Sequence, residues 1–573
     1  MHYSNKTKIF IFIIVLLVLG FGMYGIGIIK EQAWQGQIQN KILSMGEESF
    51  QLVLTNTDVF QDIAAPVEIE WWFQEESQTY YLFLPSHFEK GLYYVFNLYD
   101  YVLINDNRVE PGDRFELDNG RYILQVPDGS EITLEVMHSR HLASMFIQTD
   151  SRNLAYIQET KQNVDSGQYT LIDKEGNKSS SGKIEKFHCR GNMTFDAADK
   201  KSYAIKLKDK TGILNLGIEK DWLLLANAFD ETLSRNGIAA EITGIMGMEY
   251  APEMEYVDLY IDGEYQGNYQ LSEKVEIGED RLNIRNLEDE MEALNQDMDF
   301  ASLQSVETPV EDIPVVKWVD GLKVPENSKS GYLLELDMTY RYYEEKSGFI
   351  SSRKQAVAIK SPKCINFEQA YYLARKYQDM EDALCSTDGY NERTGMYYYD
   401  YLDMDSFARK YLMEEITKNL DASVTSFYMY IPENTSKFYA GPLWDYDRTF
   451  GTDFLRDGID LKDPCTLYAS ENVYYEEADY PLLYLISEQK EFQDLYKDIY
   501  FREIRDDVVM IQESFIDEHA EKIEDSAMMD AVRWNTLISA SDIEANRVEF
   551  KKRVAGIKDF MEQRIAFLDE EWQ

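Results

Sequence analysis

Residues 419–451 read NLDASVTSFYMYIPENTSKFYAGPLWDYDRTFG. An aromatic and β-branched run (VTSFYMYI) and a second apolar run (FYAGPLW) flank the turn-forming segment PENTSK, a pattern that predicts a β-hairpin. Asp421 comes just before the first strand and Asp445 just after the second, so antiparallel pairing brings both carboxylates to the same open end. Asp447 follows two residues later and, in extended chain, shares the face of Asp445.

These three acids form a pattern with a chemical use. A pair of carboxylates, here Asp445 and Asp447, suits Mg²⁺, which takes one or two protein carboxylates and fills its other positions with water and phosphate oxygens. The remaining acid, Asp421, can then act as a base, and phosphoryl transfer requires this division of roles. Any one of the three has an ordinary explanation as a strand-end acid that caps a turn. Their convergence favours a site.

Length, composition and charge limit the classes of protein to which this chain can belong. A chain of 573 residues with 44% hydrophobic side chains has room for two to four packed domains. Its 57 basic and 103 acidic residues give a formal charge of −46, which repels nucleic acid, so nucleic-acid binding is excluded as the function. An ATP-like ligand must therefore meet local cations. The four cysteines are widely spaced and show no C-x-x-C pattern, which argues against a zinc site, and leaves open whether they pair.

The N-terminal segment 9–29 is uncharged, mostly apolar and long enough to span a lipid bilayer. Lys6 and Lys8 precede it, which predicts a cytoplasmic N-terminal stub, an anchor within residues 1–30, and main domains outside the cytoplasm. A cleaved signal peptide is the alternative. Alternating short strands with Gly, Asp, Asn and Pro turns then predict a small β-sandwich-like module at 45–140, which carries no catalytic constellation.

Strands continue to about residue 285. In the predicted strand KSYAIKL (residues 201–207), Lys206 faces away from the apolar residues on either side of it. Asp230 is a good N-cap for a helix over 231–246, in which Glu241 falls inside the apolar stripe. A buried carboxylate needs a partner. Lys206 is one candidate, and bonding at the stripe edge to Arg235 or water is the other.

The second half of the chain changes character. Residues 286–329 are acidic and poor in pattern, which predicts an insert or mobile loop. After residue 366 the spacing is mainly helical, with further helices from 480 to the end. A β-rich part (141–285) followed by a helical part (330–573) predicts a two-lobed α+β domain with the ligand cleft between the lobes.

Seven motifs in this order resemble the spore coat protein H (CotH) family of atypical protein kinases, over roughly residues 140 to 573. They are Arg190-Gly191-Asn192, Tyr203-x-Ile-Lys206, Trp222-x-Leu-Leu-Ala-Asn227, Arg235-Asn236, Val257-x-Leu-Tyr-x-Asp-Gly-Glu-Tyr-x-Gly267, Tyr332-Leu-Leu-Glu-x-Asp337 and Gly441-Pro-Leu-Trp-Asp-Tyr-Asp447. The resemblance implies a kinase-like fold, ATP as donor, Mg²⁺ or Mn²⁺ as cofactor and a protein substrate with a Ser or Thr hydroxyl.

The resemblance also implies roles. Lys206 would hold the α and β phosphates with Glu241 as its helix partner, and Glu273 would lie where the hinge meets adenine. Asp421 matches the catalytic acid and Asp445 the metal-binding acid. The metal role of Asp447 rests on spacing alone.

Two features depart from the kinase pattern. No G-x-G-x-x-G loop precedes the lysine strand, so Arg190 and its Gly-Asn neighbours would cover the phosphates. The residue five after the catalytic acid is Ser426 instead of Asn, and a hydroxyl is a weaker magnesium ligand, unless Asn419 or Asp447 substitutes.

Three functions fit the sequence. The first is a membrane-anchored, ATP- and metal-dependent protein kinase. The second is a metal-dependent glycosyltransferase, because Asp445-Tyr446-Asp447 is also a D-x-D pattern. The third is a surface or scaffold protein with an inert kinase-like domain.

Overall fold

The computed structural model describes residues 50–54, 68–86, 92–96, 100–111, 113, 117–422, 425–453, 455–456, 458–473 and 476–573. The predicted anchor at 9–29 lies outside this range. Within it, no helix has both the length and the apolar character needed to cross a membrane.

The chain divides into two compact units. The first comprises residues 1–152, 168–181 and 258–266, and the second comprises residues 153–167, 182–257 and 267–573. All the predicted site residues belong to the second unit. The first unit nevertheless takes in three segments of the region predicted to form the kinase-like domain, 141–152, 168–181 and 258–266.

The first unit contains strands throughout the region predicted to be all-β. A six-stranded sheet has the order β3-β4-β9-β8-β6-β7, and a three-stranded sheet has the order β2-β1-β5. The bounds are β1 Phe50–Leu54, β2 Glu68–Glu70, β3 Trp72–Gln74, β4 Thr79–Leu84, β5 Leu92–Phe96, β6 Val102–Ile104, β7 Asn107–Val109, β8 Gly120–Gln125 and β9 Glu131–His138. The β4–β9 pair is parallel, so this part is not a simple meander.

An antiparallel sheet β12-β13-β14-β16, which is part of a closed barrel, has most of its residues in the second unit. Its strands are β12 (Lys178–Arg190), β13 (Ser202–Gly212), β14 (Ile218–Leu225) and β16 (Glu264–Glu273). Tyr203, Ile205 and Leu207 are buried, whereas Ala204 and Lys206 between them are partly exposed, as the alternation in KSYAIKL predicts.

Helix α4 (Arg235–Ile245) follows β14 and starts later than predicted. Asp230 does not cap it directly. Instead the Asp230 carboxylate accepts the backbone N–H groups of Thr232 (3.0 Å) and Arg235 (2.7 Å), and so shapes the loop that leads into the helix. The delayed start follows from this loop, because the donors that a helix cap would use are bonded before the helix begins.

A seven-stranded sheet with the order β17-β18-β20-β21-β19-β24-β25 is formed by strands between residues 305 and 440. Its strands are β17 (Ser305–Val310), β18 (Ile313–Val319), β19 (Tyr332–Asp337), β20 (Gly348–Ile350), β21 (Ala356–Ser361), β24 (Phe427–Ile431) and β25 (Tyr439–Ala440). The predicted hairpin is present as β24–β25, with Met429 opposite Ala440.

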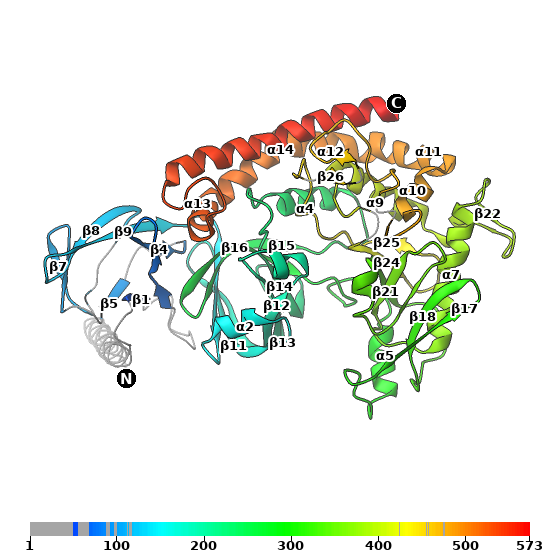
Figure 1. The fold of residues 1–573 in the computed structure, drawn as a ribbon, viewed down its shortest axis with the longest axis horizontal. Coiled ribbons are helices and arrows are strands. Elements are labelled where there is room, and N and C mark those ends of the chain that lie inside the picture. The colour runs from blue at the N-terminus through cyan, green and yellow to red at the C-terminus, as the bar shows by residue number, and fades with distance from the viewer. Residues whose placement is uncertain are drawn as a thin grey trace, which may run out of the picture. The chain divides into compact units, whose positions relative to one another are not determined.

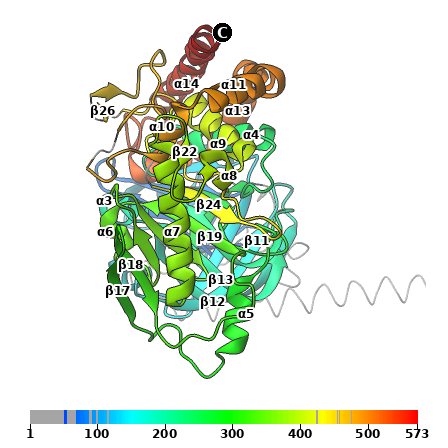
Figure 2. The ribbon, with the colours of Figure 1, turned by 90° about the vertical axis from the view of Figure 1, so that its right-hand side faces the viewer.

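One prediction about this region is wrong. Residues 286–329 are not a mobile loop, because they contain α5 (Leu287–Leu294) and strands β17 and β18, which pair with each other, and β18 also pairs with β20. The helical description of 330–573 is incomplete, because β19, β21 and β24, the last of which is the first strand of the predicted hairpin, are buried in a sheet. Helix α7 (Phe367–Leu384) lies against β18 of this sheet (Figure 2).

The remaining helices agree closely with the predicted amphipathic segments. They are α9 (Met404–Thr417), α10 (Leu482–Ser487), α11 (Lys490–Ile499), α12 (Arg505–Met510), α13 (Ile516–Trp534) and α14 (Ile543–Trp572). Short π-helical turns, Tyr500–Ile504 and Ile511–Phe515, join α11, α12 and α13 into one continuous helical segment. Helices α13 and α14 lie side by side (Figure 1).

Candidate active site

Backbone hydrogen bonds bring the two acidic segments together. The N–H of Leu420 donates to the carbonyl of Arg448 (3.2 Å), and the N–H of Phe450 donates to the carbonyl of Thr417 (2.8 Å). Asp421 directly follows Leu420, and Asp447 directly precedes Arg448. The end of α9 and the segment after β25 are thus tied to each other at the positions next to the predicted acids.

The acids are close enough to affect one another's ionisation. Burial first, and then the negative charges of Asp445, Asp421 and Asp230, raise the pKa of Asp447 to about 8, while Arg448 opposes them. The three predicted acids therefore act on one another. Asp230, which sequence reasoning treated only as a helix cap, adds a fourth negative charge to the same region.

Asp445 and Ser426 are in direct contact. The Ser426 hydroxyl donates to Oδ2 of Asp445 at 3.0 Å. Both residues have left-handed backbone conformations, with φ of 53° at Ser426 and 70° at Asp445. Such conformations cost about 1 kcal/mol or more in a non-glycine residue and concentrate at functional sites. The residue that stands where a kinase has Asn therefore contacts the predicted metal-binding acid.

Tyr446, between the two metal-site candidates, is an anchor in the core. Its hydroxyl donates to Oε1 of Glu414 on α9 (2.7 Å), and Lys410, one helical turn earlier, pairs with the same carboxylate at 2.6 Å. All three side chains are buried. This network fixes the backbone that carries Asp445 and Asp447.

The acids fit a hydrated divalent cation and not a closed protein cage. In the described part of the chain, no three acidic, histidine or cysteine side chains converge closely enough to hold a metal ion alone. Mg²⁺ usually keeps several waters and uses only one or two carboxylates, so Asp445 and Asp447 with the Ser426 hydroxyl form a suitable donor set. Their crowded negative charge supports this fit, since a cation would neutralise it.

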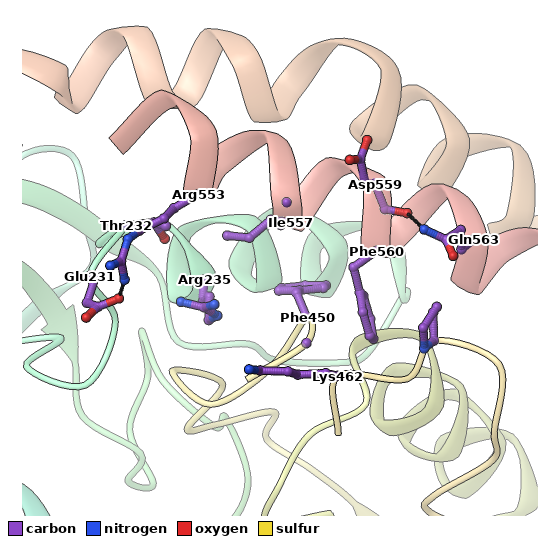
Figure 3. A pocket seen from close by; sticks show the side chains of 13 residues that line it. Glu231, Thr232, Arg235, Phe450, Lys462, Arg553, Ile557, Asp559, Phe560 and Gln563 are labelled. Carbon is purple, nitrogen blue, oxygen red and sulfur yellow. Dashed lines mark hydrogen bonds and ion pairs between the residues drawn. The ribbon is translucent and has the colours of Figure 1, made fainter. Parts of the chain in front are cut away.

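A small cavity of about 20 Å³ adjoins Asp445 and Trp444, with Asn236 of α4 in its wall. This is room for about one water molecule. A larger cavity of about 290 Å³ adjoins Phe450 and is lined by residues of the α4 loop and of α14 (Figure 3). In its wall Arg553 pairs with Glu231. No predicted site residue lines it.

Strand register separates the two predicted phosphate-binding cations. Arg190 lies opposite Ser202, at the start of β13, whereas Lys206 lies opposite Lys186 and Asp221. Four residues of strand correspond to about 13 Å. The Arg190 guanidinium lies 5.9 Å from the ring centre of Trp444, the residue before Asp445.

Lys206 lies near the middle of β13, away from Trp444. There it acts on Glu292 of α5, whose pKa burial raises and Lys206 helps to lower. Arg190 is therefore the predicted cation next to the acids.

The expected partner of Lys206 is elsewhere. Glu241 on α4 is exposed, so the prediction that it is buried in the apolar stripe is wrong. No ion pair joins Glu241 to Lys206 among the residues that the structure describes. The helix turns Ile238 and Ile242 into the core instead, and Glu241 falls just outside that face.

The Glu273 side chain, predicted to contact adenine, instead bonds to other groups of the protein. Its carboxylate pairs with Arg281 (2.6 Å) and accepts the Tyr250 hydroxyl (2.9 Å) and the Gly217 N–H (3.1 Å). Arg281 in turn lies over Trp222, 4.9 Å from the ring centre. A buried carboxylate with this many donors stabilises the end of β16.

An apolar cluster joins the two sheets of the second unit. Its buried members are Leu223, Leu282, Ile284, Leu333, Tyr428, Tyr430 and Trp444. Ala204, from the face of β13 that also carries Lys206, packs against it. The cluster therefore places aromatic faces directly beside the acidic segment.

Sequence reasoning missed one cation near Asp421. Burial alone would lower the pKa of Arg341, but Asp337 and also Asp421 raise it overall. Arg341 donates to the Thr425 hydroxyl (2.9 Å), which donates to Asp337 (2.9 Å). The sequence did contain an indication of this charged group, because Asp337 ends a mostly apolar strand within one of the seven motifs.

Together these features define a kinase-like α+β domain with an acidic site carried by α9 and the segment after β25. A family model described as CotH kinase protein matches residues 187–568, most of the chain. The chain belongs to this family, which confirms the resemblance. A search of curated proteins found no match.

Proposed function

We propose that this protein is an ATP- and metal-dependent protein kinase that phosphorylates Ser or Thr hydroxyls. The observation that carries the proposal is the backbone pairing of the Asp421 loop with the segment that carries Asp445 and Asp447. It supplies a potential base and two potential metal ligands from separate parts of the chain.

In the proposed reaction, the Asp421 carboxylate takes the proton of the substrate hydroxyl. The hydroxyl oxygen forms a bond to the γ-phosphorus, the bond from that phosphorus to the β–γ bridging oxygen breaks, and ADP leaves. Asp445, Asp447 and Ser426 would hold Mg²⁺ or Mn²⁺. A bound divalent cation supplies neutralisation of phosphate charge. The apolar cluster that includes Trp444 would stack on the adenine base.

We propose Arg190 as the main phosphate-binding cation, with Lys206 in a lesser role. Replacing Arg190 with Met is expected to weaken ATP binding about 10-fold or more in the presence of Mn²⁺, because a charge-assisted hydrogen bond to phosphate contributes about 1.5–3 kcal/mol. Lys206→Met is expected to weaken it less than about 3-fold. Titration calorimetry of the purified full-length protein would measure both. A larger loss of ATP affinity from Lys206→Met than from Arg190→Met would contradict this proposal and favour Lys206 as the main phosphate-binding residue, as the resemblance implied.

The proposed activity has a direct test. The full-length protein in detergent would be incubated with γ-labelled ATP and Mn²⁺ or Mg²⁺, and label transferred to a protein hydroxyl is the expected result. A parallel thermal-shift screen would compare ATP with nucleotide sugars. Stabilisation by a nucleotide sugar alone would favour the glycosyltransferase, and no response to any nucleotide would favour the inert scaffold.

We also propose that residues 9–29 anchor the chain in a lipid bilayer with its main domains outside the cytoplasm. The length, the apolar character and the preceding lysines support this orientation. Protease treatment of intact cells is expected to degrade the domains and spare the N-terminal stub. Protection of the domains would reverse the proposed orientation and place the active site where ATP is abundant.

A further inference from the structure

A directed chain of side-chain amides connects the first sheet of the second unit to the acidic segment. The Asn227 amide donates to Oε1 of Gln270 on β16 (2.9 Å). The Asn236 amide donates to Oδ1 of Asn227 (2.8 Å). Oδ1 of Asn236 accepts the backbone N–H of Tyr446 at 3.1 Å. All three amides are buried.

The chain has only one workable direction. Each amide donates through nitrogen and accepts through oxygen, so turning one over would put two donors or two acceptors face to face. Because Asn227 occupies the nitrogen of Asn236, the Asn236 oxygen is left to accept from Tyr446. Each of the three bonds pairs a donor with an acceptor, whereas the Gln270 Nε2 at the far end is buried without a hydrogen-bond partner. Loss of Asn236 or Asn227 would leave further buried polar groups unpaired.

The residue before Asn236 holds the other end of the same segment. Nε of Arg235 donates to the carbonyl of Thr449 (2.9 Å), and the Thr449 hydroxyl donates to the carbonyl of Tyr446 (2.7 Å). Two successive residues at the start of α4 therefore hold residues 446–449 at both ends. The exposed Glu241 makes no such contact.

We propose that Asn236 is a positioning residue that holds the Asp445–Asp447 segment in its metal-binding conformation and couples it to α4. This inference rests on the proposed function, because it concerns the same metal site. It gives α4 a link to the metal segment that does not depend on a Lys206–Glu241 pair. Residues that orient metal ligands typically contribute 10- to 100-fold to metal affinity.

Mn²⁺ binding without nucleotide tests the proposal on the full-length protein. Asn236→Ala is expected to raise the Kd for Mn²⁺ by about 10-fold or more. Asn295→Ala is the matched control. Asn295 directly follows α5, is also a buried asparagine, and donates hydrogen bonds to the carbonyls of Met291 and Lys323. This control is expected to lose a similar amount of thermal stability with an unchanged Kd.

A milder variant keeps the test decisive if Asn236→Ala does not fold. Gln270→Met removes only the far end of the amide chain and is expected to raise the Kd about 3-fold, which is the effect of losing one ordinary hydrogen bond. Wild-type affinity in the folded Asn236→Ala or Gln270→Met variant would overturn the inference alone. A wild-type protein that binds no Mn²⁺ would overturn the proposed metal site, and the inference with it.

Discussion

Asp421→Asn is expected to lower the rate of phosphoryl transfer by about 10²- to 10⁴-fold, the range typical of losing a general base. The substitution keeps the shape of the side chain and the hydrogen bond in which the Asp421 backbone N–H donates to Oδ1 of Asn419 (3.3 Å). It removes the group that would accept the substrate proton. Single-turnover transfer from γ-labelled ATP would measure the rate.

The Asp421→Asn variant should still bind Mn²⁺ and ATP. Asp421→Asn removes one of the negative charges that crowd Asp447, so binding of Mn²⁺ and ATP is expected to be unchanged or tighter. Asp405→Asn, at an exposed acid on α9 that pairs with Arg409, is the control and should transfer phosphate at the wild-type rate. A wild-type rate in Asp421→Asn would remove this residue from the chemistry.

Arg564→Met is expected to destabilise the second unit by about 3–5 kcal/mol, because it leaves a buried charge without its partner. Arg564 on α14 pairs with Glu415 on α9 at 2.7 Å, and both side chains are almost fully buried. Its guanidinium also donates to the carbonyls of Pro464 and Thr466. One side chain thus joins α9, α14 and the loop that follows the acidic segment.

Urea denaturation followed by near-ultraviolet circular dichroism would measure this loss. Arg502→Met is the matched control, since Arg502 forms an exposed pair with Asp498 and its loss should change stability by less than about 1 kcal/mol. A second variant, Glu415→Leu with Arg564→Met, is expected to recover part of the loss because it removes the unpaired charge. Unchanged stability in Arg564→Met would contradict the structural role of the pair.

The elements of the site follow from local patterns in the chain. The turn chemistry of PENTSK and the apolar runs beside it predicted the β24–β25 hairpin, and helical spacing predicted α9, which ends just before Asp421. The composition of 286–329 was misleading. Its exposed acidic residues obscured two strands, of which β17 pairs with β18, and β18 pairs with β20, a partner more than twenty residues further along the chain.

The sequence by itself determined the hairpin and the helix that ends before Asp421, because turn chemistry and the periodicity of side chains act over a few residues. Only the tertiary structure decided which side chains support the acids. Register along β13 separated Arg190 from Lys206, and the contact of Asn236 with Tyr446 joins residues 210 positions apart. Such partners are chosen by the packing of distant elements, which no local periodicity encodes.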